Sequence, residues 1–296
     1  MITPFAARKL VAGNAAPNQE LPPDRTRAWT LPHLFLEGTG LQRAAAALLT
    51  LLVLFAVIGP VAWPDHAAQD LSRFLEPPNL GEPLGRDHLG RSVIARLAHA
   101  ARLSLLLAVL CVATALLVGS LAGIIAAWRG GWIDTVLHGV SEAFIALPAL
   151  LVVLIFSAVA NGDLWTLYVG LALAQWVEYF RMVRSRSGLI LAGPAVEAAG
   201  MLKLGPAHII RRHLWPELRP LLTTMATFGV GSSILALSTL GFVGIGIRPP
   251  TPELGLMVTE AFPYYHEAPW MSLAPVLILT IILIGLLSLR NKEARL

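Results

Sequence analysis

Side chains that could carry out catalysis are few in this sequence and lie far apart along it. A phosphate-binding P-loop needs a lysine followed by serine or threonine, whereas Lys9, Lys203 and Lys292 are followed by leucine, leucine and glutamate. Of the eight histidines, His208 and His213 lie five residues apart, off the i, i+4 spacing that would place two ligands on one face of an α-helix. The sequence therefore predicts no catalytic residue, no metal site and no cofactor bound by this chain, so we do not expect it to be an enzyme.

The segment 196–220, VEAAGMLKLGPAHIIRRHLWPELRP, is basic and too polar to cross a membrane. Gly205 fits a turn and Pro206 fits the first position of a helix, and we expect this helix to stop at Pro216. A second short helix over 196–202 would precede it, so that the two helices meet at a Gly-Pro corner. An apolar stripe is expected at Ile209, Ile210 and Leu214.

Three interpretations of this segment compete. Its helix could lie on a membrane surface with the arginines on anionic lipid, or it could be a DNA-binding helix-turn-helix. It could also be a docking element, because a short helix held between two membrane helices can transmit a partner's motion into them. A segment fixed between two spans would be held away from DNA, so we expect no nucleic-acid partner.

The segment 64–102 combines turn residues with charges. Its prolines favour an extended chain, and Gly85 and Gly90 permit tight turns. Asp87 and Arg91 are predicted to form a local salt bridge rather than to contact a substrate. Apolar residues at helical spacing follow Gly90, and we expect this part to lie in the membrane interface before the next span begins.

The elements that position both segments are predicted to be membrane helices. Only 14% of the residues are charged and 56% are hydrophobic, with a mean hydropathy of +0.68, whereas soluble domains carry about 25% charged residues. A bilayer core of ~30 Å requires about 20 apolar residues in a helix. Six windows meet or approach this length: 44–63, 103–127, 143–160, 164–180, 221–247 and 268–289. We therefore expect an all-α membrane protein with six transmembrane helices, within a membrane domain at 41–290 that follows a disordered tail at 1–40.

The orientation follows from the distribution of lysine and arginine, which favour the cytoplasmic side. With six spans, 16 of the 22 basic residues fall on the side that holds the tail, the 181–220 loop and the C-terminus. Both termini and the 181–220 loop are therefore predicted to be cytoplasmic, and the 64–102 segment is predicted to be extracytoplasmic.

Small residues within the predicted spans indicate close helix packing. Gly119 and Gly123 form a G-x-x-x-G pattern, and the fifth window is rich in glycine and serine, which suits a helix that lines a path. An ion-gradient-driven secondary transporter would instead be expected to carry charges at mid-membrane. The second, fifth and sixth windows contain none.

The segment 196–220 resembles the EAA loop of ATP-binding-cassette (ABC) importer permeases, which forms a coupling helix in a groove of the ATPase subunit. The matching residues are Glu197, Ala198, Ala199, Gly205, Pro206, Ile209, Arg212, His213 and Pro216. Two further stretches are similar to extracytoplasmic signatures of the dipeptide/oligopeptide/nickel permeases within this group. The residues that carry this similarity are Gly85, Asp87, Gly90 and Arg91 in the first stretch, and Pro252, Glu253 and Gly255 in the second.

The sequence departs from the family pattern at several positions. Lys203 stands where the EAA loop usually has glycine, and a lysine does not readily adopt a positive φ, so we expect the corner to be shaped differently, with Gly205 as the alternative position. Arg86 and Ser92 replace the usual threonine before Asp87 and the usual aspartate after Arg91.

The resemblance implies a type I ABC importer permease in a bacterial cytoplasmic (inner) membrane. The implied partners are a second homologous permease subunit, two ABC ATPase subunits that bind ATP and Mg, an extracytoplasmic solute-binding protein and membrane lipid. The implied cargo is a peptide, with nickel or a metal–chelator complex as the alternative within the same family.

Overall fold

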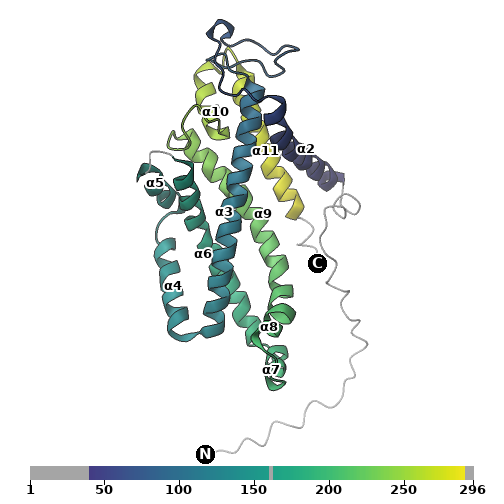
Figure 1. Ribbon diagram of the computed structural model, residues 1–296, viewed down its shortest axis with the longest axis vertical. Helices are drawn as coiled ribbons and strands as arrows, with labels where there is room; N and C mark the ends of the chain where they lie inside the picture. Colours follow the sequence, from purple (N-terminus) through teal and green to yellow (C-terminus); the bar gives the residue numbers. More distant parts are fainter. Residues whose placement is uncertain (1–39, 160–162, 291–296) are drawn as a thin grey trace, which may run out of the picture.

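The computed structural model describes residues 40–159 and 163–290, and the regular structure within these ranges is helical (Figure 1). The predicted tail at 1–40 lies outside them except for Gly40. The first half of the described chain contains α2 (Gly40–Ala62), α3 (Val93–Arg129), α4 (Gly131–Ile145), α5 (Ala149–Val159) and α6 (Leu164–Leu191). The second half contains α7 (Pro194–Met201), α8 (Pro206–Ile209), a π-helical turn (Ile210–Leu214), α9 (Trp215–Phe242), α10 (Leu254–Ala261) and α11 (Pro269–Arg290). Short 3-10 turns occur at Leu71–Arg73 and Phe262–Tyr264.

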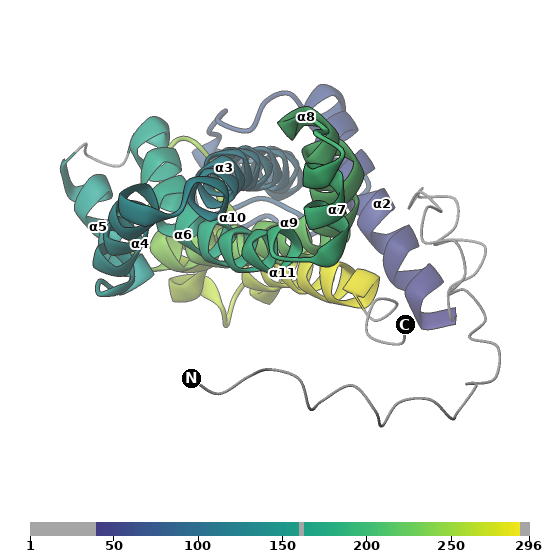
Figure 2. The ribbon, with the colours of Figure 1, turned by 90° about the horizontal axis from the view of Figure 1, so that it is seen from below.

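The helices form an elongated bundle whose two ends differ. The loop between α2 and α3 lies with α10 at one end, and α7 and α8 lie at the other (Figure 1). We refer to these as the α10 end and the α7 end. Seen from the α7 end, α4 and α5 lie on one side of α3 and α2 diverges on the opposite side (Figure 2). The two segments that carry the sequence motifs are therefore separated by the length of the bundle.

Four helical stretches within the described residues are long and apolar enough to cross a membrane. These are Gln42–Ala62, Val93–Arg129, Pro206–Phe242 and Pro269–Ser288. They correspond to the first, second, fifth and sixth predicted windows. The second begins ten residues before the predicted window, because Ser92 caps the helix by accepting from the Ala95 amide.

The third and fourth windows do not form helices of the expected extent. The chain that runs through the third window is broken between Ile145 and Ala149, and α5 has only 11 residues. Pro148 lies in this break, where it lacks an amide donor and restricts the residue before it. In the fourth window, α6 continues past 180 to Leu191, so a helix occupies the first part of the predicted 181–220 loop.

The bundle is organised around α3, which packs against α2, α6 and α9. Its contact with α6 is close because of the predicted glycine pair. A Cβ on Gly119 would lie 2.5 Å from the carbonyl oxygen of Trp176, and one on Gly123 would lie 2.8 Å from that of Phe180. The G-x-x-x-G prediction is confirmed, since only glycine allows the two backbones this approach.

Candidate functional site

At the α7 end, α7 finishes in a left-handed residue that turns the chain. The amide of Lys203 donates to the carbonyl of Gly200 at 2.9 Å, and the amide of Leu204 donates to that of Ala199 at 3.0 Å. This pair of bonds is a Schellman motif, whose left-handed position is usually occupied by glycine. Lys203 itself adopts φ 54°, whereas Gly205 has φ −69°. The corner therefore lies at Lys203 and not at the alternative position Gly205, because the lysine takes the left-handed conformation.

The predicted stop at Pro216 is also wrong. Pro206 begins α8, as expected, but the helix passes through the π-helical turn and continues as α9 to Phe242. Pro216 is the second residue of α9 and directly follows the π-helical turn, so the helix continues through it. The segment is thus joined to a long membrane helix without an intervening loop.

The π-helical turn changes which side chains face the bundle. Ile209 and Leu214 are buried, while Ile210 is 38% exposed, so the predicted stripe of three residues is wrong at Ile210. In a π-helix residues five apart lie near one another, which explains why Ile209 and Leu214 point the same way. The same turn brings the rings of His208 and His213 to a centroid distance of 6.2 Å.

Most residues of the predicted docking element are on the surface. Glu197, in the first turn of α7, is exposed, and so are Ala198 and Arg212. Large apolar side chains are exposed beside them, with Met201 at 76% and Leu202 at 73%. Of the other predicted residues, Ala199 and Ile209 are buried, His213 is half-buried, and Gly205, Pro206 and Pro216 are exposed. An exposed mixture of apolar and basic side chains is typical of a surface that meets another molecule.

At the α10 end, Asp87 holds a tight turn closed. Its Oδ1 accepts from the amides of Leu89 and Arg91, each at 2.9 Å. Gly85 and Gly90 have φ of 65° and 67°, and a Cβ on Gly90 would collide with the carbonyl oxygen of Asp70. The tight turns predicted at these two glycines are present.

The same carboxylate anchors a buried ring of four charges. Asp87 Oδ2 accepts from Arg91 at 2.7 Å and from Arg96 at 2.6 Å. Both guanidinium groups also donate to Glu260 of α10, at 3.2 Å and 2.5 Å. The Arg91, Arg96 and Asp87 side chains are at most 3% exposed, so two positive and two negative groups neutralise one another away from solvent. The predicted Asp87–Arg91 salt bridge is confirmed as part of this larger network.

The network also sets the protonation state of Asp87. Burial by itself would raise the pKa of this carboxyl, but Arg96, the Arg91 amide and the Arg91 guanidinium together hold the pKa below its ordinary value. Asp87 is therefore ionised at neutral pH, as the two arginines require. Neither guanidinium is left with an uncompensated charge.

The two residues that depart from the family pattern in this region share a partner. Arg86 donates to Glu82 Oε1 at 2.8 Å, and the Ser92 hydroxyl donates to Glu82 Oε2 at 2.6 Å. Arg86 also donates to the carbonyl of Gly90 at 2.7 Å. Glu82 thus links both unusual residues and ties the loop to the start of α3.

The third predicted motif packs α10 against α9. Glu253 is fully buried and accepts from the Leu256 amide and the Ser238 hydroxyl, at 2.9 and 3.0 Å. Burial raises the pKa of Glu253. A Cβ on Gly255 would collide with the carbonyl oxygen of Ser238, and Pro252 is buried. Glu253 caps α10, and Gly255 permits the contact between the two helices.

Sequence reasoning missed Arg96, Glu260 and Glu82. Arg96 could have been noticed as a second arginine on a helix expected to lie in the interface. Glu260 carried no local signal, since it lies 164 residues from Arg96. In residues 40–159 and 163–290 there is no group of three or more His, Cys, Asp or Glu side chains that could hold a metal ion.

The described residues form an all-helical protein with four stretches long and apolar enough to cross a membrane. A family model described as "binding-protein-dependent transport system inner membrane component" matches residues 119–291. The chain belongs to this family, and it is a permease subunit of an ABC importer rather than an enzyme.

Individual relatives agree with this membership. The chain is 33% identical over 233 residues to the dipeptide transport system permease protein of Bacillus subtilis, covering 78% of this chain and 73% of the relative. It is 28% identical over 273 residues to that of Alkalihalophilus pseudofirmus, covering 91% and 90%. It is 28% identical over 241 residues to the probable D,D-dipeptide transport system permease protein of Escherichia coli, covering 81% of each.

Proposed function

We propose that this chain forms half of a translocation path for peptides, the other half being formed by a second homologous permease subunit. An extracytoplasmic binding protein delivers the peptide, and two ABC ATPase subunits bind ATP and Mg and supply the energy. The names of the relatives, which are dipeptide and D,D-dipeptide permeases, support a peptide rather than nickel or a metal–chelator complex.

We propose six crossings, with both termini in the cytoplasm. The α4–α5 pair and α6 supply the third and fourth crossings, in addition to the four long apolar stretches. The α7 end is then cytoplasmic and the α10 end extracytoplasmic. The excess of lysine and arginine in the segments assigned to the α7 end supports this orientation.

The residues from Glu197 to Pro216 are proposed to couple the ATPases to the path. The observation that carries this proposal is their place at one tip of the bundle, exposed and joined to α9 by continuous helix. A partner that displaces this tip acts directly on a membrane helix. The signature residues from Gly85 to Arg91 and from Pro252 to Gly255 hold the opposite end together and are proposed to have a structural role.

The exposed face of α9 is proposed to line the path. It presents the hydroxyls of Ser232 and Thr239 beside Phe228 and Leu235. The exposed face of α2 presents mainly apolar side chains such as Leu51 and Val57. A face with hydroxyl groups suits contact with a polar cargo, and an apolar face suits lipid.

The coupling role is tested by charge reversal at the tip. In the reconstituted importer, Glu197→Arg is expected to abolish the ATPase activity that the binding protein stimulates, or to prevent co-elution of the ATPase subunits. Asp163→Arg is the matched control, since Asp163 is an exposed carboxylate at the start of α6. Stimulated activity and co-elution equal to those of the unaltered importer would disprove docking through Glu197.

The orientation is tested by cysteine labelling. Cys111 is the single cysteine of the chain, so a Cys111→Ala background leaves no native thiol. Single cysteines at Lys203 and Leu80, both exposed, are expected to react with an impermeant reagent from opposite sides of the membrane. Labelling of both from one side would disprove the proposed topology.

The cargo is tested by uptake of a labelled dipeptide in competition with nickel.

A further inference from the structure

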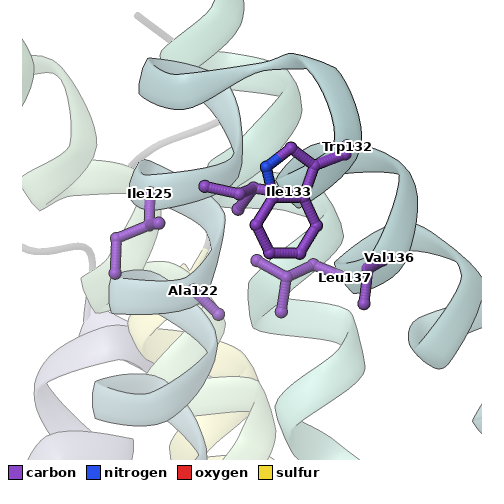
Figure 3. A pocket seen from close by; sticks show the side chains of 6 residues that line it. All are labelled: Ala122, Ile125, Trp132, Ile133, Val136 and Leu137. Atoms are coloured by element: carbon purple, nitrogen blue, oxygen red, sulfur yellow. The ribbon is translucent and has the colours of Figure 1, made fainter.

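A crevice between α3 and α4 near the α7 end has apolar walls and no occupant among the described residues. Its volume is about 430 Å³, within the range of about 300–1,000 Å³ that is common for sites that bind small molecules. Side chains from both helices converge on it (Figure 3). The lining residues are Ala122 and Ile125 on α3, and Trp132, Ile133, Val136 and Leu137 on α4.

The crevice lies beside the end of the second predicted membrane window. The second predicted window ends at 127, so Ala122 and Ile125 occupy its last two turns. Trp132 is 75% exposed just beyond the corner between α3 and α4, and tryptophan favours the level of the lipid headgroups. A chain that enters the crevice from the bilayer would thus have its polar end beside Trp132.

A cation follows the lining residues of α3. Arg129 lies four residues after Ile125, on the same face of α3, and its side chain is exposed. Among residues 40–159 and 163–290 it has no ion-pair partner. The acid nearest to Arg129 along the sequence, Asp134, is held in a bidentate pair with Arg184, with Nη2 and Oδ2 at 2.6 Å. The exposed charge at this corner is therefore positive.

The corner itself keeps these groups close. Gly130 and Gly131 both have positive φ, 60° and 54°, which lets α4 begin two residues after α3 ends. A Cβ at either position would meet nothing within 4 Å, so the glycines serve the backbone conformation and not the space around them. Arg129 is thus the last residue of α3 and Trp132 the second residue of α4, three positions apart across one tight turn.

We propose that this crevice is a binding site for an anionic phospholipid. One acyl chain lies between α3 and α4, and the phosphate lies against Arg129 and the indole N–H of Trp132. The charge of Arg129 favours lipid over an apolar helix of a partner subunit, because a helix would leave Arg129 without a counter-ion. The site does not depend on the cargo or on ATPase docking; the proposed orientation decides only that the lipid belongs to the cytoplasmic leaflet.

The proposal is tested on the complete importer by native mass spectrometry of bound lipid. The probes are phosphatidylglycerol and phosphatidylethanolamine with identical chains. Arg129→Gln is expected to lower retention of phosphatidylglycerol about fivefold, which corresponds to about 1 kcal/mol for one basic residue near a membrane surface, and Arg129→Lys is expected to restore it. Ala122→Phe fills the crevice and is expected to lower retention of both lipids about tenfold, since each buried methylene contributes about 0.8 kcal/mol.

Two matched controls separate the site from the general lipid-facing surface. Arg102→Gln alters an exposed arginine at the other end of α3, and Leu117→Phe enlarges an exposed apolar residue of α3 that does not line the crevice. Neither is expected to change retention. Unchanged phosphatidylglycerol in both Arg129→Gln and Ala122→Phe would overturn the proposal. Loss of the second permease subunit in Ala122→Phe, with lipid retained, would overturn it in favour of a protein occupant.

Discussion

Replacing Lys203 by glycine is expected to stabilise the corner at the α7 end. The left-handed conformation of Lys203, with φ 54°, costs a residue with a Cβ about 1–2 kcal/mol. Glycine avoids this cost but loses about 0.5–1 kcal/mol more through conformational entropy on folding. The net gain for Lys203→Gly is therefore about 0.5–1 kcal/mol.

Hydrogen exchange measures this change locally, where a global unfolding experiment would not. The amide of Leu204, which donates to the carbonyl of Ala199, is protected by the Schellman motif and exchanges when the corner opens. A gain of about 0.5–1 kcal/mol slows its exchange about two- to fivefold if the corner opens locally.

Two neighbouring variants make the test specific. Lys203→Ala removes the charge and the long side chain but keeps the Cβ, so it is expected to leave the exchange rate nearly unchanged. Leu202→Gly acts at a residue with φ −80°, where glycine brings only the entropic cost, and is expected to speed exchange. Equal slowing in Lys203→Ala and Lys203→Gly would refute the backbone explanation and assign the effect to the lysine side chain.

Three further predictions concern the network, its neighbouring histidine and the helix contacts. Asp87→Asn leaves two buried arginines with one carboxylate and is expected to destabilise the α10 end by about 3–5 kcal/mol, measured as lower resistance of the 64–92 loop to proteolysis in the purified importer. His88 stacks on Tyr264 at a centroid distance of 5.3 Å, and burial lowers the pKa of His88 below its ordinary value of 6.5. Folding therefore favours the neutral ring. The stability that His88 contributes is present above pH 6.5 and is lost as the pH falls through the pKa of the folded state. The 64–92 loop should be cleaved faster at pH 5.5 than at pH 7.5, and a His88→Asn variant that keeps the full difference would contradict this cause. Gly119→Ala should lower the thermal stability of the importer because its Cβ would meet the α6 backbone, whereas Gly205→Ala, with nothing within 4 Å of the added Cβ, should not; equal effects would argue against the close contact.

The sequence was sufficient for features that depend on short spacings. Asp87 and Arg91 form a local ion pair, and Gly119 and Gly123 mark the close contact between α3 and α6. Four of the six apolar windows coincide with long helices. In each case the relevant groups lie within one element or one turn, where periodicity carries the information.

Other features depend on information that no local pattern contains. The pairing of Arg96 with Glu260 joins residues 164 positions apart. The spacing argument for His208 and His213 assumed α-helical geometry, and the π-helical turn invalidated it. The conformation of Lys203 contradicts its intrinsic preference, because the hydrogen bonds that end α7 fix the backbone there.

The helix from Pro206 to Phe242 is continuous, and a close contact at Gly229 divides it into two arms of unequal length. Its 37 residues span about 55 Å at 1.5 Å per residue. The tightest contact along its middle is at Gly229, where a Cβ would collide with the hydroxyl of Tyr179. Measured from that point, the arm toward α8 is about 35 Å long and the arm toward α10 is about 20 Å long.

A tilt of about 10° about Gly229 would move the α8 end by about 6 Å and the α10 end by about 3.5 Å, from the same rise per residue. In such a rotation the end near Glu253 would travel a shorter distance than the α8 end. The position of Gly229 along the helix therefore fixes how far each end would travel in a rotation about that contact.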